Sequence, residues 1–190
     1  RPHRRNTRYR KAKQMQMLEQ KQSLLDELKA YGKDLDAVSL LTYFLDRFEG
    51  KIVLTSSMAA EDQVLTDMIV KINPATEILT LDTGRLPQET YDVIAATQKR
   101  YGIKIRVLFP DYTLVEGMIA KHGVNLFYDS VHNRKLCCHV RKIEPLKRAL
   151  KDMDIWICGL RKEQSVTRSG IEPIQWDEQF GLIKLSPLLD

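Results

Sequence analysis

Short apolar runs alternate with amphipathic helical patterns from residue 51 onward, and this alternation restricts the fold more than any other feature of the sequence. Apolar runs of this length predict strands that are buried on both faces of a sheet. We expect strands at residues 51–55, 77–81, 103–108 and 155–158. We expect helices between and after them, at residues 61–72, 87–101, 114–122 and 137–151. Strands that alternate with helices predict an α/β fold, a parallel twisted sheet with helices on both faces.

The first 50 residues follow a different pattern. Apolar spacing predicts helices over residues 10–30 and 36–48. Residues 1–13 hold seven Arg or Lys and no acid, whereas the whole chain has 30 Lys and Arg against 25 Asp and Glu. The net charge of +5 therefore belongs to a basic N-terminal tail, and the rest of the chain is slightly acidic. We interpret the tail as a solvated terminus in preference to a nucleic-acid-binding arm.

Composition excludes several classes of protein. No run of about 18 apolar residues is present, so we expect no transmembrane helix and no membrane partner. Three cysteines, two of them adjacent, do not resemble the disulfide framework of a secreted protein. A reducing, cytoplasmic setting fits this cysteine usage better.

Polar residues follow three of the predicted strands directly. They are Ser56 and Ser57, then Asp82, Thr83 and Gly84, then Gly159, Leu160 and Arg161. Because ligands of parallel α/β sheets bind at the carboxyl ends of the strands, we expect these residues to line one cleft. The first set precedes a predicted helix, where unpaired amides and the helix dipole favour an anion, although an ordinary serine cap would give the same pattern. The third set opens a donor-rich segment, residues 159–168, whose arginines suit phosphate or sulfate, although exposed loops are often charged.

Adjacent cysteines at positions 137 and 138 precede Arg141 and Lys142. Thiolates are the ligands that iron and zinc centres prefer, and neighbouring cysteines do not readily form a disulfide with each other. The pair is therefore a candidate for half of a metal site, with Lys142 placed to bring a positive charge to an anion nearby. The alternative is a pair of buried core residues. Cys158, within a predicted strand, is interpreted as a core residue.

Three motifs together resemble the sulfonucleotide reductases, the adenylyl-sulfate (APS) and phosphoadenylyl-sulfate (PAPS) reductases. Residues 137–146 match the pattern Cys-Cys-x-x-Arg-Lys-x-x-Pro-Leu of the iron–sulfur type, and residues 81–84 match Leu-Asp-Thr-Gly. Residues 159–168 match Gly-x-Arg-x-x-Gln-Ser-x-x-Arg. The resemblance implies an adenine nucleotide alpha hydrolase-like fold of the PP-loop type, with a helical extension over residues 1–50 and a nucleotide-binding reductase domain over residues 51–190.

The resemblance also implies an activity, the thiol-dependent reduction of APS to sulfite and AMP in sulfate assimilation through a thiosulfonate enzyme intermediate. It implies a [4Fe–4S] cluster on Cys137 and Cys138, a catalytic Lys142, thioredoxin or a similar dithiol as reductant, and a homo-oligomer. The other two cluster cysteines and the attacking cysteine are expected beyond residue 190, so the domain is expected to be truncated at its C-terminus. The implied substrate-binding residues are Ser56, Ser57, Leu81, Asp82, Thr83, Gly84, Gly159, Arg161, Gln164, Ser165 and Arg168.

Two alternatives remain open at this point. One is a PAPS reductase, although the cysteine pair favours the unphosphorylated substrate. The other is a catalytically silent nucleotide-binding module. Met58 and Ala59 depart from the Ser-Phe-Gly-Ala-Glu-Asp of the family's phosphate loop, and the lost glycine is expected to restrict the backbone there.

Overall fold

The structure, a computed structural model, describes residues 3–161 and 171–189, with side chains from residue 15 onward. The strands of the described chain are β1 (Ile52–Thr55), β2 (Glu77–Leu81), β3 (Ile105–Leu108), β4 (Ile155–Cys158), β5 (Ile174–Asp177) and β6 (Leu182–Leu185). They form one sheet in the order β3-β2-β1-β4-β6-β5, in which only β5 pairs antiparallel with its neighbour among the described strands. The chain order reverses at β1, which pairs with β2 on one side and β4 on the other.

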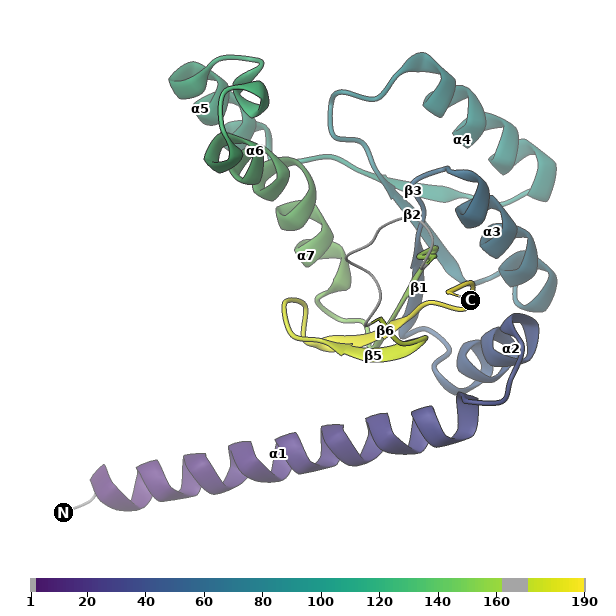
Figure 1. Cartoon of the computed structure of the whole chain (residues 1–190), viewed down its shortest axis with the longest axis vertical. Coiled ribbons are helices and arrows are strands. Elements are labelled where there is room, and N and C mark those ends of the chain that lie inside the picture. Colours follow the sequence, from purple (N-terminus) through teal and green to yellow (C-terminus); the bar gives the residue numbers. More distant parts are fainter. Residues whose placement is uncertain (1–2, 162–170, 190) are drawn as a thin grey trace.

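Helices lie on both faces of this sheet (Figure 1). In the described residues they are α1 (His3–Gly32), α2 (Ala37–Arg47), α3 (Ala60–Ile72), α4 (Gln88–Tyr101), α5 (Tyr112–His122), η1 (Leu126–Tyr128), α6 (Val131–Cys138), η2 (His139–Ile143) and α7 (Glu144–Leu150). The predicted parallel α/β sheet with helices on both faces is therefore confirmed.

The two faces of the sheet have separate cores. On one face, Phe44 of α2, Leu65 of α3 and Ile94 of α4 pack with the inward residues of the strands. On the other face, Leu146 and Leu150 of α7 pack with the alternate strand residues. Because successive strand residues point to opposite faces, both faces of β1 and β4 are apolar and these strands lie at the centre of the sheet.

The N-terminal helix α1 is long, and its first half projects away from the body of the molecule (Figure 1). Its last turns pack against the sheet through Leu25 and Leu28, which join the same core as α2. The division of the chain at residue 50 stays a prediction. No helix in the described ranges has the length and apolar character that a membrane crossing requires.

The hairpin formed by β5 and β6 was not predicted. Its strands have four residues each, and the turn between them depends on Asp177 and Gly181. The Asp177 side chain accepts a hydrogen bond from the Phe180 amide at 3.0 Å, and Gly181 has a φ of 70°. β5 is an edge strand in which Gln175 and Asp177 are polar, so it lacks the continuous apolar run that marks the central parallel strands. The turn residues were the available signal.

The helix predicted over residues 137–151 begins earlier than expected and is interrupted. Ser130 caps α6 by accepting a hydrogen bond from the Asn133 amide, so the helix starts at Val131. Directly after Cys138, η2 is one turn of π-helix, with a hydrogen bond from the Glu144 amide to the His139 carbonyl. Pro145 follows at the start of α7 and has no amide hydrogen to continue the α-helical pattern. π-Helical turns of this kind often occur at functional sites.

Candidate functional site

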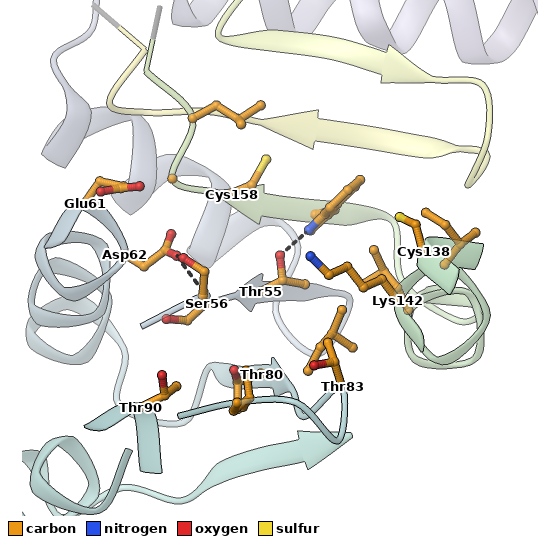
Figure 2. A pocket seen from close by; sticks show the side chains of 18 residues that line it. Thr55, Ser56, Glu61, Asp62, Thr80, Thr83, Thr90, Cys138, Lys142 and Cys158 are labelled. Carbon is orange, nitrogen blue, oxygen red and sulfur yellow. Dashed lines mark hydrogen bonds between the residues drawn. The ribbon is translucent and has the colours of Figure 1, made fainter. Parts of the chain in front are cut away.

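A cavity of about 470 Å³ lies at the carboxyl ends of the central strands (Figure 2). It is lined from the ends of β1, β2 and β4 and from the helices α3, α4, α6, η2 and α7. One part of its wall is polar, with Thr55, Ser57 and Thr83, and another part is apolar, with Leu146 and Trp156. The cavity is beside β1, where the strand order reverses, and ligands of open α/β sheets bind at this position.

The loop after β1 is held by its own side chains. The Ser56 hydroxyl accepts a hydrogen bond from the Met58 amide at 3.1 Å, and Ser56 is buried. Met58 has a φ of 66°, which is in the left-handed region, whereas Ala59 has an extended backbone with a φ of −73°. Alanine at position 59 is therefore accommodated without strain, because the left-handed conformation is at Met58.

Asp62 connects this loop to the end of β4. Its carboxylate accepts hydrogen bonds from both the amide and the hydroxyl of Ser57, each at 2.6 Å. Burial raises the pKa of Asp62 above its ordinary value, against the opposing effect of these hydrogen bonds. The same carboxylate lies against Gly159, where a Cβ atom would be 2.2 Å from its Oδ1. Gly159 is therefore required by the close approach of Asp62, in addition to lining the cavity.

The turn formed by residues 81–84 follows β2. Asp82 is buried and accepts hydrogen bonds from the Gly84 amide at 2.8 Å and from the Tyr91 hydroxyl at 2.7 Å. The hydrogen bond to Asp82 raises the pKa of the Tyr91 hydroxyl. Gly84 has a φ of 72°, which explains a glycine at this position. Asp82 and Gly84 thus shape the turn, while Leu81 and Thr83 line the cavity.

The cysteine pair divides between the cavity and the interior. Cys138 is exposed and lines the cavity with Lys142, whose amine is directed toward Thr55 in Figure 2. Cys137 is buried in a small cluster with Met118 and Leu126. Two successive helical residues point about 100° apart, so the two sulfur atoms do not face the same way.

Cys158 is buried, and its interpretation as a core residue is confirmed. It also lines the cavity, although its sulfur lies 3.6 Å from the Ser186 hydroxyl, on the side of β6. Burial raises the pKa of Cys158 to about 11. Its thiol is therefore protonated at neutral pH and is a weak nucleophile.

The predicted gathering of three strand ends in one cleft is confirmed. The cavity is lined by seven of the residues named in the sequence analysis as site residues, namely Ser56, Ser57, Leu81, Thr83, Cys138, Lys142 and Gly159. Asp82, Gly84, Arg161 and Cys137 are not among its lining residues, and Gln164, Ser165 and Arg168 lie outside the described residues. Leu160, which was also expected at this cleft, lines the cavity as well, and the further lining residues are Thr55, Glu61, Asp62, Thr80, Leu86, Thr90, Ile143, Leu146, Trp156 and Cys158.

Some of these further residues had a signal in the sequence. Asp62 and Glu61 belong to the segment that was compared with the phosphate loop. Trp156 shares a strand face with Cys158 by the two-residue period of a strand, and its indole N–H donates to the Thr55 hydroxyl at 2.7 Å.

Cys137 and Cys138 are thiol donors of the kind that metal clusters take. In the described part of the chain, no three side chains of His, Cys, Asp or Glu come together as a metal site. The [4Fe–4S] cluster expected on Cys137 and Cys138 stays a prediction, since Cys138 lines the cavity whereas Cys137 is buried in the interior.

Comparison with known proteins agrees with the three motifs. Residues 51–190 match the family described as the phosphoadenosine phosphosulfate reductase domain. The chain belongs to this family. The match starts one residue before β1 and includes all strands of the described sheet.

Several relatives are similar over most of this chain. The adenosine 5'-phosphosulfate reductase of Burkholderia cepacia is 44% identical over 168 residues, which are 88% of this chain and 66% of the relative. The enzyme of the same name from Allochromatium vinosum is 40% identical, over 92% of this chain and 68% of the relative. The chain thus spans about two thirds of the length of these curated relatives.

A solved structure has the same fold. It is the phosphoadenylyl-sulfate (PAPS) reductase of Candida auris in a phosphate complex, with a TM-score of 0.70 and 26% identity. The superposition covers 87% of this chain and 78% of that chain. Relatives of this chain are therefore named for both nucleotides.

Proposed function

We propose that the cavity binds adenylyl sulfate and that the protein reduces it to sulfite and AMP with a thiol as electron donor. The single observation that carries this proposal is that one cavity is lined by the ends of β1, β2 and β4 together with Cys138 and Lys142. Leu81, Lys142 and Gly159, one from each of the three motifs, are far apart in the sequence and meet at this cavity in the folded chain. The relatives named adenosine 5'-phosphosulfate reductase support APS as the substrate.

The residues of the cavity have different roles in this proposal. Lys142 is a cation at the wall and stabilises the negative charge of the sulfate and of the departing phosphate. Ser57 already donates its amide and its hydroxyl to Asp62, so its role is to order the loop after β1. Ala59 is the N-cap residue of α3, and its side chain accepts no hydrogen bond from the helix. The backbone amides of the first turn of α3 are therefore the donors that we assign to an anion at this loop.

The reaction needs a thiolate that attacks the sulfur of the sulfate group. A bond forms between the two sulfur atoms, the bond from the sulfate sulfur to the bridging oxygen breaks, and AMP leaves with the electron pair. A dithiol such as thioredoxin then attacks the enzyme's thiosulfonate at the cysteine sulfur, releases sulfite and is itself oxidised to a disulfide. Cys158 is unsuited to the first step because its pKa is about 11. We assign the attacking thiolate to a cysteine outside residues 1–190.

We propose that Cys137 and Cys138 hold part of a [4Fe–4S] cluster, in accordance with their pairing and with Lys142 one turn away. When bound, such a cluster supplies electrostatic stabilisation at the site and does not need to transfer electrons. The residues of this chain hold the thiolates on a helix whose π-turn follows the pair directly. The proposed setting is a reducing cytoplasm, where thiolates persist.

The test is sulfite release by the full-length protein that carries this chain. Anaerobically prepared protein is supplied with thioredoxin and with either APS or PAPS, and its iron and sulfide contents are measured. The proposal predicts faster sulfite release from APS than from PAPS. The reverse preference would reassign the substrate, and nucleotide binding without sulfite release would show a silent module.

A further inference from the structure

Arg141 has an unusual environment for an arginine. It is only 7% exposed, whereas its neighbours Lys142 and His139 on η2 are exposed. Its Nη1 donates a hydrogen bond to the carbonyl oxygen of Thr83 at 2.6 Å, across 58 positions of sequence. The side chain therefore joins the helix that carries Cys138 and Lys142 to the turn that ends β2.

The turn formed by residues 81–84 is fixed from two sides by this contact. Within the turn, the Asp82 carboxylate accepts a hydrogen bond from the Gly84 amide. From outside, Arg141 holds the Thr83 carbonyl, and a Cβ atom at position 84 would be 3.2 Å from the Arg141 Nη1. The glycine therefore allows both the positive φ of the turn and the close approach of the guanidinium group.

The burial of Arg141 is costly for a residue with only a structural role. In the described residues its Nε has no hydrogen-bond partner, and the same is true of the buried Oε2 of Glu144. A buried cation is tolerated where its contacts offset the loss of hydration, and apolar side chains fill such a space at lower cost. The contact that Arg141 does make is with the wall of the cavity.

We infer that Arg141 is a positioning residue for the nucleobase, which fixes the turn at residues 81–84 relative to Lys142. This inference rests on the proposed function, because it assumes that a nucleotide occupies the cavity. Leu81 and Thr83 both line the cavity, and backbone groups at a strand end offer donors and acceptors that complement the edge of a base. Arg141 itself does not line the cavity, so it acts through the turn and not by touching the ligand.

The test compares a ligand that has the base with one that lacks it. The dissociation constants of AMP and of ribose 5-phosphate are measured by titration calorimetry on the 190-residue chain and on its Arg141→Met variant. We expect the constant for AMP to rise about tenfold, since a hydrogen bond from a charged donor is lost. We expect the constant for ribose 5-phosphate to stay within about twofold, because the inference assigns the base, and not the ribose phosphate, to the turn.

Two further variants make the result specific. Arg141→Lys keeps the charge and can donate one hydrogen bond, so it should recover part of the AMP affinity. Arg148→Met is the matched control, because Arg148 also donates to a carbonyl, that of Phe109 at 2.7 Å, but Phe109 does not line the cavity as Thr83 does. Its AMP affinity should equal that of the unmodified chain.

Each contrary outcome has a definite meaning. AMP affinity within twofold of the unmodified chain in Arg141→Met, or an equal loss for both ligands, overturns the inference and leaves the proposed function standing. Failure of the unmodified chain to bind AMP overturns both. If Arg141→Met does not fold, Arg141→Lys carries the test, and failure of both variants to fold would show a purely structural role.

Discussion

Gly159→Ala is the substitution for which the structure gives the sharpest prediction. The added Cβ atom would lie 2.2 Å from the Asp62 Oδ1 and 3.0 Å from the Glu61 Cγ. Real Cβ atoms do not approach other atoms so closely, so the Asp62 side chain must move. It is buried and bound to Ser57 by two hydrogen bonds of 2.6 Å, and any movement weakens them.

The size of the effect follows from these contacts. A hydrogen bond to a charged group contributes about 1.5–3 kcal/mol, and overpacking of an interior site costs about 1–3 kcal/mol. Because the loop relaxes in part, we expect the free energy of unfolding to fall by about 2–4 kcal/mol. For a chain of this size each kcal/mol lowers the melting temperature by about 2–4 °C.

The assay is urea denaturation followed by circular dichroism, with AMP titration at a temperature where the variant is folded. Gly117→Ala is the matched control, since a Cβ atom at position 117 in α5 meets nothing within 4 Å. The control should gain about 0.5–1 kcal/mol, as alanine suits a helix better than glycine. A Gly159→Ala chain as stable as the unmodified one, with unchanged AMP affinity, would refute the close approach of Asp62 to the end of β4.

The remaining predictions concern charge and protonation at the same cavity. Lys142→Ala should lower AMP affinity by about tenfold while the urea midpoint stays constant. Lys147 is exposed on the following helix α7, and Lys147→Ala should change neither the AMP affinity nor the urea midpoint. Equal affinities in the two variants would count against the role of Lys142. Because burial raises the pKa of Cys158 to about 11, iodoacetamide at pH 8 should label the exposed Cys138 before Cys158. Labelling of Cys158 should become faster as the pH approaches 11. Equal labelling rates of the two cysteines at pH 8, measured by mass spectrometry, would contradict this. Burial also raises the pKa of Asp62, so its contribution to stability is complete below the unfolded pKa of about 3.9 and is lost as the pH rises through the raised value. Asp62→Asn should therefore lose less stability than the unmodified chain between pH 4 and pH 7, and a steeper loss in urea denaturation would disprove this.

The parallel part of the fold could be predicted because its signals are local. Strands β2 and β4 were predicted with their observed bounds, and β1 was predicted to within a residue. These strands are apolar on both faces and are followed by polar turns, and the rule that ligands bind at strand ends then placed three segments at one cleft. The hairpin of β5 and β6 was missed because the edge strand β5 has polar residues at alternate positions and its turn depends on one aspartate and one glycine.

The site was harder to predict wherever a residue acts through a contact that is distant in sequence. Arg141 was noted within the cysteine motif, but its hydrogen bond to Thr83 depends on η2 lying close to the turn that follows β2. The same holds for Gly159, whose lack of a side chain is required by Asp62, almost 100 residues earlier. Sequence motifs identify which residues matter, and the folded chain separates those that line the cavity from those that shape it.

The most direct measurement of the central claim is a crystal structure of this chain soaked with AMP. The account predicts AMP in the cavity at the ends of β1, β2 and β4, with its base beside the turn at residues 81–84 and its phosphate on the side of Lys142 and the start of α3. AMP bound at another surface, with this cavity empty, would contradict the account.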